Sequence, residues 1–246
     1  MILATLFAYD FDGTLAPIVS QPDAARMLPE TERALVTLSQ RAPVVVISGR
    51  SLEDLARRVP LPRSNLIGNH GLEGLGADSA ALTRAILTTS KWAEQLSRFV
   101  DRPSNRLPPG AWIENKGASL SIHTRACSDA APPERVIKRL LEICQTLTPM
   151  PRIIGGKKIL NLIPPGSPNK GDALLAALRS QSPKSARHAF YAGDDETDED
   201  VFRLVGTHPI TTLRVGFEPS SRAQAFITEQ HQILKILHGQ IASLLR

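Results

Sequence analysis

The segment 6–15, LFAYDFDGTL, constrains this chain more than any other part of it. An apolar run, typical of a buried strand, ends in two aspartates that are separated by one residue. Residues i and i+2 of a strand share a face, so the carboxylates of Asp10 and Asp12 can converge at the strand's carboxyl end. Convergent carboxylates repel unless a cation or a shared proton lies between them. The pattern therefore favours a nucleophile paired with a general acid and base over two solvated side chains in a turn.

Three later segments place reactive side chains at the ends of predicted elements. Ser48 ends the β-branched run 43–47, where its hydroxyl could bind phosphate or cap the following helix. Lys170 opens a predicted helix after Asn169, a suitable N-cap, and the helix dipole there favours a nearby anion. The acidic cluster 194–200 follows another strand. Its oxygens suit a hard cation such as Mg²⁺, although acids are also common in the first turn of a helix.

Composition narrows the class of protein. The chain has 246 residues, of which 42% are hydrophobic, enough for one large domain or two modest ones. Its two cysteines lack metal-ligand spacing, so we expect a reducing, cytoplasmic location. No apolar run reaches the roughly 20 residues of a membrane span, and the N-terminus does not resemble a signal peptide. The net charge of +5 suits a phosphorylated small molecule, whereas 4% aromatic residues give little support for nucleic-acid binding. We expect a monomer.

The order of predicted elements indicates an α/β fold. Strands alternate with helices over 2–69 and again over 170–245, which predicts a doubly wound parallel sheet covered on both faces. Ligands of such sheets bind beyond the carboxyl ends of the strands. The middle of the chain differs, because strands at 111–115, 119–124, 151–155 and 158–163 accompany only two helices, at 84–101 and 133–147. We expect a catalytic core domain at 1–83 and 168–246, with an inserted α+β cap domain at 84–167.

The four motifs resemble, in order, those of the haloacid dehalogenase superfamily of phosphatases and phosphotransferases. Within it the chain resembles the trehalose-6-phosphate phosphatase family from residue 5 to about 216. The similarity lies in four stretches: Ser48-Gly49-Arg50, Gly68-Asn69-His70-Gly71-Leu72-Glu73, the segment 114–125 (ENKGASLSIHTR), and the segment 193–200 (GDDETDED).

The resemblance implies a Mg²⁺-dependent sugar-phosphate phosphatase that works through an aspartyl-phosphate, with the cap domain recognising the sugar. Asp10 would be the nucleophile, Asp12 the general acid and base, and Ser48 and Lys170 the groups that neutralise the phosphoryl group. The implied metal ligands are Asp10, Asp12, Asp194, Asp195 and Asp198. The implied substrate-binding residues are Thr14, Gly49, Arg50, Asn69, His70, Glu73, Glu114, Lys116, His123, Arg125, Lys157 and Asn161.

Two positions depart from the family pattern. Thr124 stands where an aromatic residue usually precedes the cap arginine, and Asn161 stands where the pattern has Glu. Asn is neutral and is both donor and acceptor, whereas Glu only accepts. The departure leaves open another substrate, such as a sucrose, mannosyl-glycerate or glucosyl-glycerate phosphate, or a phosphomutase activity. A phospho-accepting regulatory domain is the alternative outside enzymes, but Asp12 and the inserted cap argue against it.

Overall fold

The computed structural model describes residues 5–102, 106–124, 126–127, 133–156, 158–180 and 188–245. The chain divides into two compact units, Met1–Ala77 with Pro168–Arg246 (the core unit) and Asp78–Ser167 (the inserted unit). The first boundary precedes the expected residue 84, because helix α3 already begins at Ser79. The side chain of Asp78 caps this helix by accepting a hydrogen bond from the Ala80 amide.

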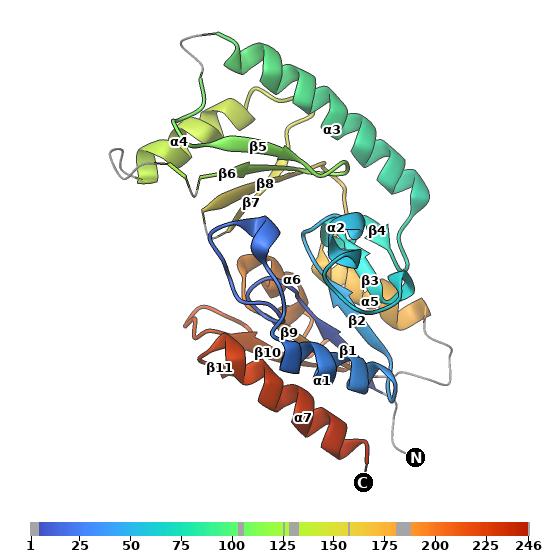
Figure 1. Ribbon diagram of the computed structural model, residues 1–246. Helices are drawn as coiled ribbons and strands as arrows, with labels where there is room; N and C mark the ends of the chain where they lie inside the picture. Colours follow the sequence, from blue (N-terminus) through green and yellow to red (C-terminus); the bar gives the residue numbers. More distant parts are fainter. Residues whose placement is uncertain are drawn as a thin grey trace. The chain divides into compact units, whose positions relative to one another are not determined.

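The core unit contains a seven-stranded sheet with the strand order β11-β10-β9-β1-β2-β3-β4 (Figure 1). All of its pairings are parallel except that of β4 with β3, so the predicted parallel sheet is confirmed and gains an antiparallel edge. The strands are β1 (Thr5–Tyr9), β2 (Val44–Ile47), β3 (Leu66–Gly68), β4 (Glu73–Gly74), β9 (His188–Gly193), β10 (Ile210–Val215) and β11 (Ala225–Ile227).

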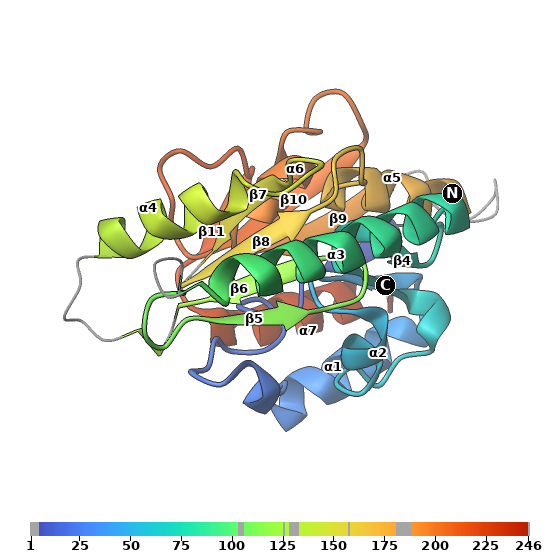
Figure 2. The same cartoon turned by 90° about the horizontal axis from the view of Figure 1, so that it is seen from above.

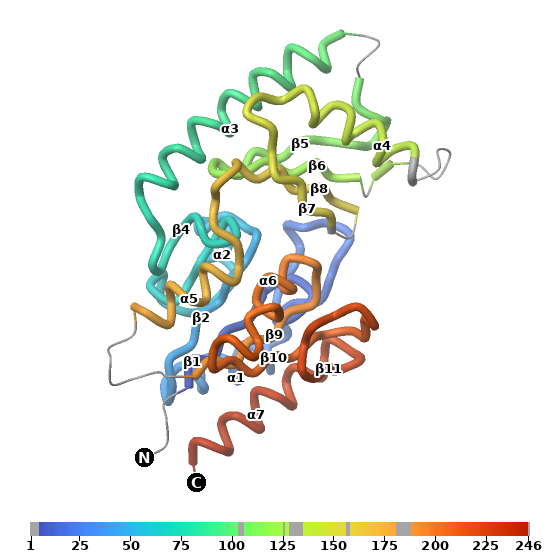
Figure 3. The backbone as a smooth tube through the Cα atoms, turned by 180° about the vertical axis from the view of Figure 1, so that it is seen from behind, coloured from blue at the N-terminus to red at the C-terminus, as the bar shows by residue number. Residues whose placement is uncertain are grey.

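Helices cover both faces of this sheet, as the doubly wound pattern predicts (Figure 3). Side chains of β1 alternate between two cores, with Phe7 and Tyr9 in one and Leu6 and Ala8 in the other. Helices α1 (Pro29–Ser39), α2 (Leu52–Ala56) and α7 (Ile233–Ser243) contribute to the first core. Helices α5 (Lys170–Ser180) and α6 (Glu199–Phe202) contribute to the second. Among the described helices, none is both long enough and apolar enough to cross a membrane.

Short 3₁₀ turns complete the core unit. They are η1 (Pro22–Ala24), η2 (Arg63–Asn65), η3 (Asn69–Gly71), η5 (Glu196–Asp198) and η6 (Gln230–Gln232). The segment after β9 therefore contains a 3₁₀ turn followed by the short helix α6. The turn is tight because the Asp198 carboxylate accepts hydrogen bonds from the amides of Asp194 and Asp195.

The inserted unit is an antiparallel sheet with two helices on one side (Figure 2). Its strand order is β5 (Trp112–Asn115), β6 (Leu120–His123), β8 (Ile159–Ile163) and β7 (Arg152–Gly156). Helices α3 (Ser79–Val100) and α4 (Pro133–Cys144) pack on the face that carries Leu120, Ile122, Leu160 and Leu162. Because strand side chains alternate, the polar residues of β6 and β8 lie on the opposite face.

We expect Leu140→Ala to lower the free energy of unfolding of the inserted unit by about 2–5 kcal/mol, because Leu140 is fully buried in its core. Chemical denaturation followed by circular dichroism measures the change. The control is Leu87→Ala on α3, whose side chain is exposed, and which should change stability by less than about 0.5 kcal/mol. Equal effects of the two substitutions would contradict this packing.

Candidate active site

A polar residue directly follows each of four neighbouring strands of the core unit. Asp194, Asp10, Ser48 and Asn69 directly follow β9, β1, β2 and β3, which are adjacent in the sheet. The Asp10 amide still donates to the Ala192 carbonyl (2.9 Å), and the Ser48 amide donates to the Ile67 carbonyl (2.9 Å). Hydrogen bonds that continue the sheet therefore fix the positions of Asp10 and Ser48, and all four residues are buried.

Lys170 forms two ion pairs in this region. Its Nζ lies 3.0 Å from Asp10 Oδ1 and 2.7 Å from Asp198 Oδ1, and all three side chains are buried. Burial alone would lower the pKa of Lys170, but the two carboxylates outweigh it and raise the pKa, so the amine stays charged. Lys170 is the first residue of α5, where a cation opposes the helix dipole. The anions beside Lys170 in the structure are these two protein carboxylates, and its contact with a bound ligand stays a prediction.

Three carboxylates converge at the carboxyl end of β1. Oxygen atoms of Asp10, Asp194 and Asp198 lie within 4.8 Å of one another. Gly13 makes this approach possible, because a Cβ at that position would lie 2.1 Å from Asp194 Oδ2. Burial, followed by the negative charges of Asp198, Asp194 and Asp12, raises the pKa of Asp10 despite Lys170. When all three carboxylates are ionised, the single ammonium leaves two excess negative charges, which a divalent cation would balance.

The Asp198 carboxylate accepts four hydrogen bonds within the protein. Its Oδ1 accepts hydrogen bonds from Lys170 Nζ (2.7 Å) and the Tyr191 hydroxyl (2.6 Å). Its Oδ2 accepts hydrogen bonds from the amides of Asp194 and Asp195, at 2.9 Å each. Asp198 therefore orients Lys170 and the loop after β9. Asp195 lies outside the described acidic cluster and caps η5 with its side chain.

Asp12 and Arg50 form a bidentate ion pair. Arg50 Nε lies 2.6 Å from Asp12 Oδ2, and Nη2 lies 2.7 Å from Asp12 Oδ1. Arg50 also contacts Asp54 Oδ2 (2.6 Å) and the Pro22 carbonyl (2.9 Å). The substrate contact that the family resemblance implied for Arg50 stays a prediction, and the structure shows the contacts of its side chain with the protein.

The turn after β3 supports the loop after β2. The amides of Asn69 and His70 donate to the carbonyls of Arg50 (2.7 Å) and Ser48 (3.0 Å). The His70 ring packs on Gly49 so closely that a Cβ there would lie 2.6 Å from the imidazole. Glu73 Oε2 accepts a hydrogen bond from the Leu52 amide (2.5 Å) at the start of α2. The structure therefore gives these residues contacts that shape the loop.

Two further predicted site residues, Thr14 and Ser48, carry hydroxyl groups. Thr14 is two residues after Asp12 in the sequence, and Ser48 follows β2, the strand next to β1. Ser48 Oγ accepts a hydrogen bond from the Arg50 amide (3.2 Å), whereas Ser51 provides the cap of α2. Thr14 Oγ1 is buried and makes no hydrogen bond to any described residue. Both hydroxyls belong to loops that follow strand ends, where a phosphate oxygen would be an acceptor for them.

The polar face of the inserted unit contains one linked pair and one linked group of three residues. Ser121 Oγ donates to Asn161 Oδ1 (2.7 Å), across neighbouring strands β6 and β8. His123 Nε2 lies 2.8 Å from Glu114 Oε2, and Lys116 Nζ lies 3.9 Å from the same oxygen. The pairing of strands thus brings four of the predicted residues together with one further residue, Ser121. The four are Glu114, Lys116, His123 and Asn161. Arg125 and Lys157, also predicted to bind substrate, lie outside the described residues.

Sequence reasoning missed four residues of these networks. Tyr191 contacts Asp198, Asp54 and Arg58 extend the contacts of Arg50, and Trp112 stacks on His123 with ring centroids 4.0 Å apart. One signal was present, because Arg50, Asp54 and Arg58 follow one another at the i, i+4 spacing of helical ion pairs. The contact of Trp112 with His123 depends on strand register, and that of Tyr191 with Asp198 depends on how η5 folds back on β9, and no local pattern specifies either.

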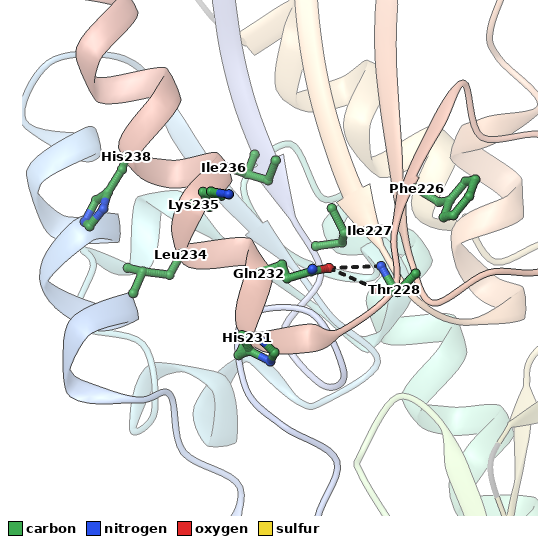
Figure 4. A pocket seen from close by; sticks show the side chains of 9 residues that line it. All are labelled: Phe226, Ile227, Thr228, His231, Gln232, Leu234, Lys235, Ile236 and His238. Atoms are coloured by element: carbon green, nitrogen blue, oxygen red, sulfur yellow. Dashed lines mark hydrogen bonds between the residues drawn. The ribbon is translucent and has the colours of Figure 1, made fainter.

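A separate pocket of about 690 Å³ lies between β11 and α7 (Figure 4). Phe226 and Ile227 line one side, and His231, Lys235 and His238 line the other. It contains none of the predicted site residues, so the acidic cluster remains the candidate active site.

We expect Lys170→Met to lower the free energy of unfolding by about 3–5 kcal/mol, because it leaves buried carboxylates without their counter-charge. Urea denaturation in a chelator measures this loss. The matched control is Lys235→Met in the exposed part of α7, which should change stability by less than about 0.5 kcal/mol. A Lys170→Met variant as stable as this control would show that the buried ion pairs do not stabilise the fold.

Comparisons with known proteins agree with this geometry. The family model described as trehalose-phosphatase matches residues 8–231. The trehalose-phosphate phosphatase of Mycobacterium bovis is 32% identical over 229 residues, covering 88% of this chain and 55% of that protein. This chain therefore spans about half the length of that curated relative.

Solved structures show the same fold at low sequence identity. A trehalose-6-phosphate phosphatase related protein is 24% identical, with a TM-score of 0.77 over 98% of this chain and 99% of the other. The C-terminal domain of the C. albicans trehalose-6-phosphate phosphatase is 23% identical, with a TM-score of 0.78 over 98% and 92%. With the family model matching nearly the whole chain, this protein belongs to the trehalose-phosphatase family.

Proposed function

We propose that this chain is a phosphoric monoester hydrolase that converts trehalose 6-phosphate and water into trehalose and phosphate. One observation supports the chemistry above all others. Asp10, at the end of β1, lies beside a buried ammonium and within a cluster of carboxylates. A carboxylate in that setting suits attack on a phosphoryl group whose charge the surroundings can neutralise. Family membership supports the choice of substrate.

In the first step, a carboxylate oxygen of Asp10 attacks phosphorus and forms an aspartyl-phosphate. The bond from phosphorus to the sugar oxygen breaks, and Asp12 gives its proton to that oxygen, which leaves as a hydroxyl group. Lys170 is the cation next to Asp10 and neutralises charge on the transferring group. Ser48, at the end of the adjacent strand β2, donates its hydroxyl hydrogen to a phosphoryl oxygen.

In the second step, water attacks phosphorus, and Asp12, now ionised, accepts a proton from that water. The bond from phosphorus to the Asp10 oxygen breaks, which restores the Asp10 carboxylate and releases phosphate. Because Asp12 gives one proton and takes one back, both side chains return to their starting states. The cycle needs no other co-substrate than water.

The donor set beside Asp10 fits Mg²⁺, a hard cation that prefers oxygen ligands. We assign Asp10, Asp194 and the Asp12 carbonyl as its ligands. We assign Asp198 the role of orienting Lys170, because its acceptor positions are already occupied. When bound, the metal supplies positive charge that offsets the buried carboxylates and the charge of the phosphoryl group.

We assign sugar recognition to the polar face of the inserted unit. Glu114, Lys116, His123 and Asn161 offer charged and amide groups on neighbouring strands, which suit sugar hydroxyls. Asn161 favours a second candidate, a different sugar phosphate in the same reaction class, because its Oδ1 accepts from Ser121 while its amide group can donate. An acceptor-only Glu at that position would bind a different pattern of hydroxyls.

A panel of sugar phosphates followed by phosphate release tests the proposal, with trehalose 6-phosphate expected to give the highest kcat/KM. Asp10→Asn should abolish turnover in every case, because an amide cannot serve as the phosphoryl acceptor. Circular dichroism checks that this variant is folded. Preference for a glycerate-bearing or sucrose phosphate would replace the substrate, whereas a phospho-protein that persists without turnover would favour a regulatory domain.

Activity should require Mg²⁺ and disappear in a chelator. Asp194→Asn should raise the Mg²⁺ concentration needed for half-maximal activity by at least about tenfold, because it removes a charged ligand. The control is Glu196→Gln, an exposed acid two residues away, which should leave the Mg²⁺ requirement unchanged. Full activity in chelator would refute the metal assignment.

A further inference from the structure

A chain of alternating charges links Asp12 to helix α2. Arg50 contacts both Asp12 and Asp54, and Arg58 contacts the far side of the Asp54 carboxylate. The Arg58 side chain is 5% exposed, and its Nη1 donates to the carbonyls of Asp23 (3.0 Å) and Ala25 (2.9 Å). The chain of charges therefore begins at Asp12 and ends on the backbone of the loop that contains η1.

Arg50 is held from several directions. Its guanidinium lies over the Phe11 ring, with Cζ 5.4 Å from the ring centroid. Its Nη2 donates to the Pro22 carbonyl, and its Nη1 donates to Asp54 Oδ2. The remaining contacts, from Nε and Nη2, are made with the two oxygens of Asp12. A planar guanidinium in a bidentate pair fixes the orientation of the carboxylate, so whatever fixes Arg50 also fixes Asp12.

Asp54 is the contact that joins the two arginines. Arg58 Nε and Nη2 lie 2.7–3.0 Å from the Asp54 oxygens, and Arg50 Nη1 lies 2.6 Å from Oδ2. Burial would raise the pKa of Asp54, but hydrogen bonds from Arg58 and Arg50 outweigh it and lower the pKa. Without this carboxylate, two guanidinium groups would face each other with no negative charge between them.

We propose that Asp54 is a positioning residue for Asp12, acting through the grip of Arg50 on both carboxylate oxygens. The inference rests on the proposed function, in which Asp12 protonates the leaving sugar oxygen. A loosened Arg50 lets Asp12 rotate away from that oxygen, so the step that needs a proton slows. The attack of Asp10 and the charge supplied by Lys170 do not depend on Asp54, because no described contact joins them to it.

First-turnover kinetics with two leaving groups test this role. The first substrate is trehalose 6-phosphate, or the sugar phosphate hydrolysed fastest in the panel, whose sugar oxygen needs a proton to leave. The second is p-nitrophenyl phosphate, whose phenolate leaves without one. Asp54→Asn should slow the first-turnover release of the sugar at least about tenfold. This loss is a part of the rate acceleration that general acid catalysis contributes. First-turnover p-nitrophenol release and the KM of the sugar phosphate should change less than about twofold.

Two further variants sharpen the result. Arg50→Lys keeps the charge but not the bidentate geometry and should give the same split between leaving groups. Glu53→Gln removes a neighbouring carboxylate of α2 that pairs with the exposed Arg57 and Arg63, and it should behave as the wild type. Thermal unfolding checks that each variant is folded.

The inference is overturned if Asp54→Asn slows the first-turnover release of sugar and of p-nitrophenol equally, or slows neither. Phosphatase activity of the wild type leaves the proposed function intact in that case. A wild-type protein that hydrolyses no phosphate ester overturns the proposed function and this inference with it. Should Asp54→Asn unfold, Arg50→Lys decides the question alone, by the presence or absence of the same split.

Discussion

The buried ammonium of Lys170 is the interaction on which the rest of the site depends. Carboxylates removed from water repel one another and lose hydration, and a nearby cation is what makes their burial tolerable. Lys170 contacts Asp10 from β1 and Asp198 from η5, so one charge joins three elements that are far apart in the chain. The remaining negative charge at Asp10 and Asp194 is what makes this place suitable for a divalent cation.

Two aspartates only two residues apart are supported by separate parts of the core unit. The charge of Asp10 is compensated by Lys170 of α5, a helix whose Leu174 packs in the core on one face of the sheet. Asp12 is compensated by Arg50 and α2, whose Leu55 belongs to the other core. Phe11, fully buried between them in sequence, separates the two networks and lies under the Arg50 guanidinium. This separation gives Asp10 and Asp12, the proposed nucleophile and the proposed proton donor, different surroundings although they lie at one strand end.

The two faces of the sheet in the inserted unit carry different kinds of side chain. The apolar face packs on α3 and α4, and the alternation of strand side chains sends Ser121, His123 and Asn161 to the other face. On that face polar groups are paired with one another, as in the bond from Ser121 to Asn161. A ligand there would meet groups whose orientations are already fixed, which favours selectivity between similar sugars.

Local patterns in the sequence determined the strand ends, the order of motifs and the helix starts, because side-chain alternation and capping involve residues only a few positions apart. Asp10, Ser48, Lys170 and Asp194 could be placed in this way, as could Asn169, which caps α5 through its bond from the Asp172 amide. Only the tertiary structure decided the partners of these residues. Arg50 pairs with Asp12, Glu73 accepts a hydrogen bond from the Leu52 amide at the start of α2, and Asp198 orients Lys170. Those contacts join residues 21 to 38 positions apart, and such pairs depend on sheet order and register, which form only when the whole core packs.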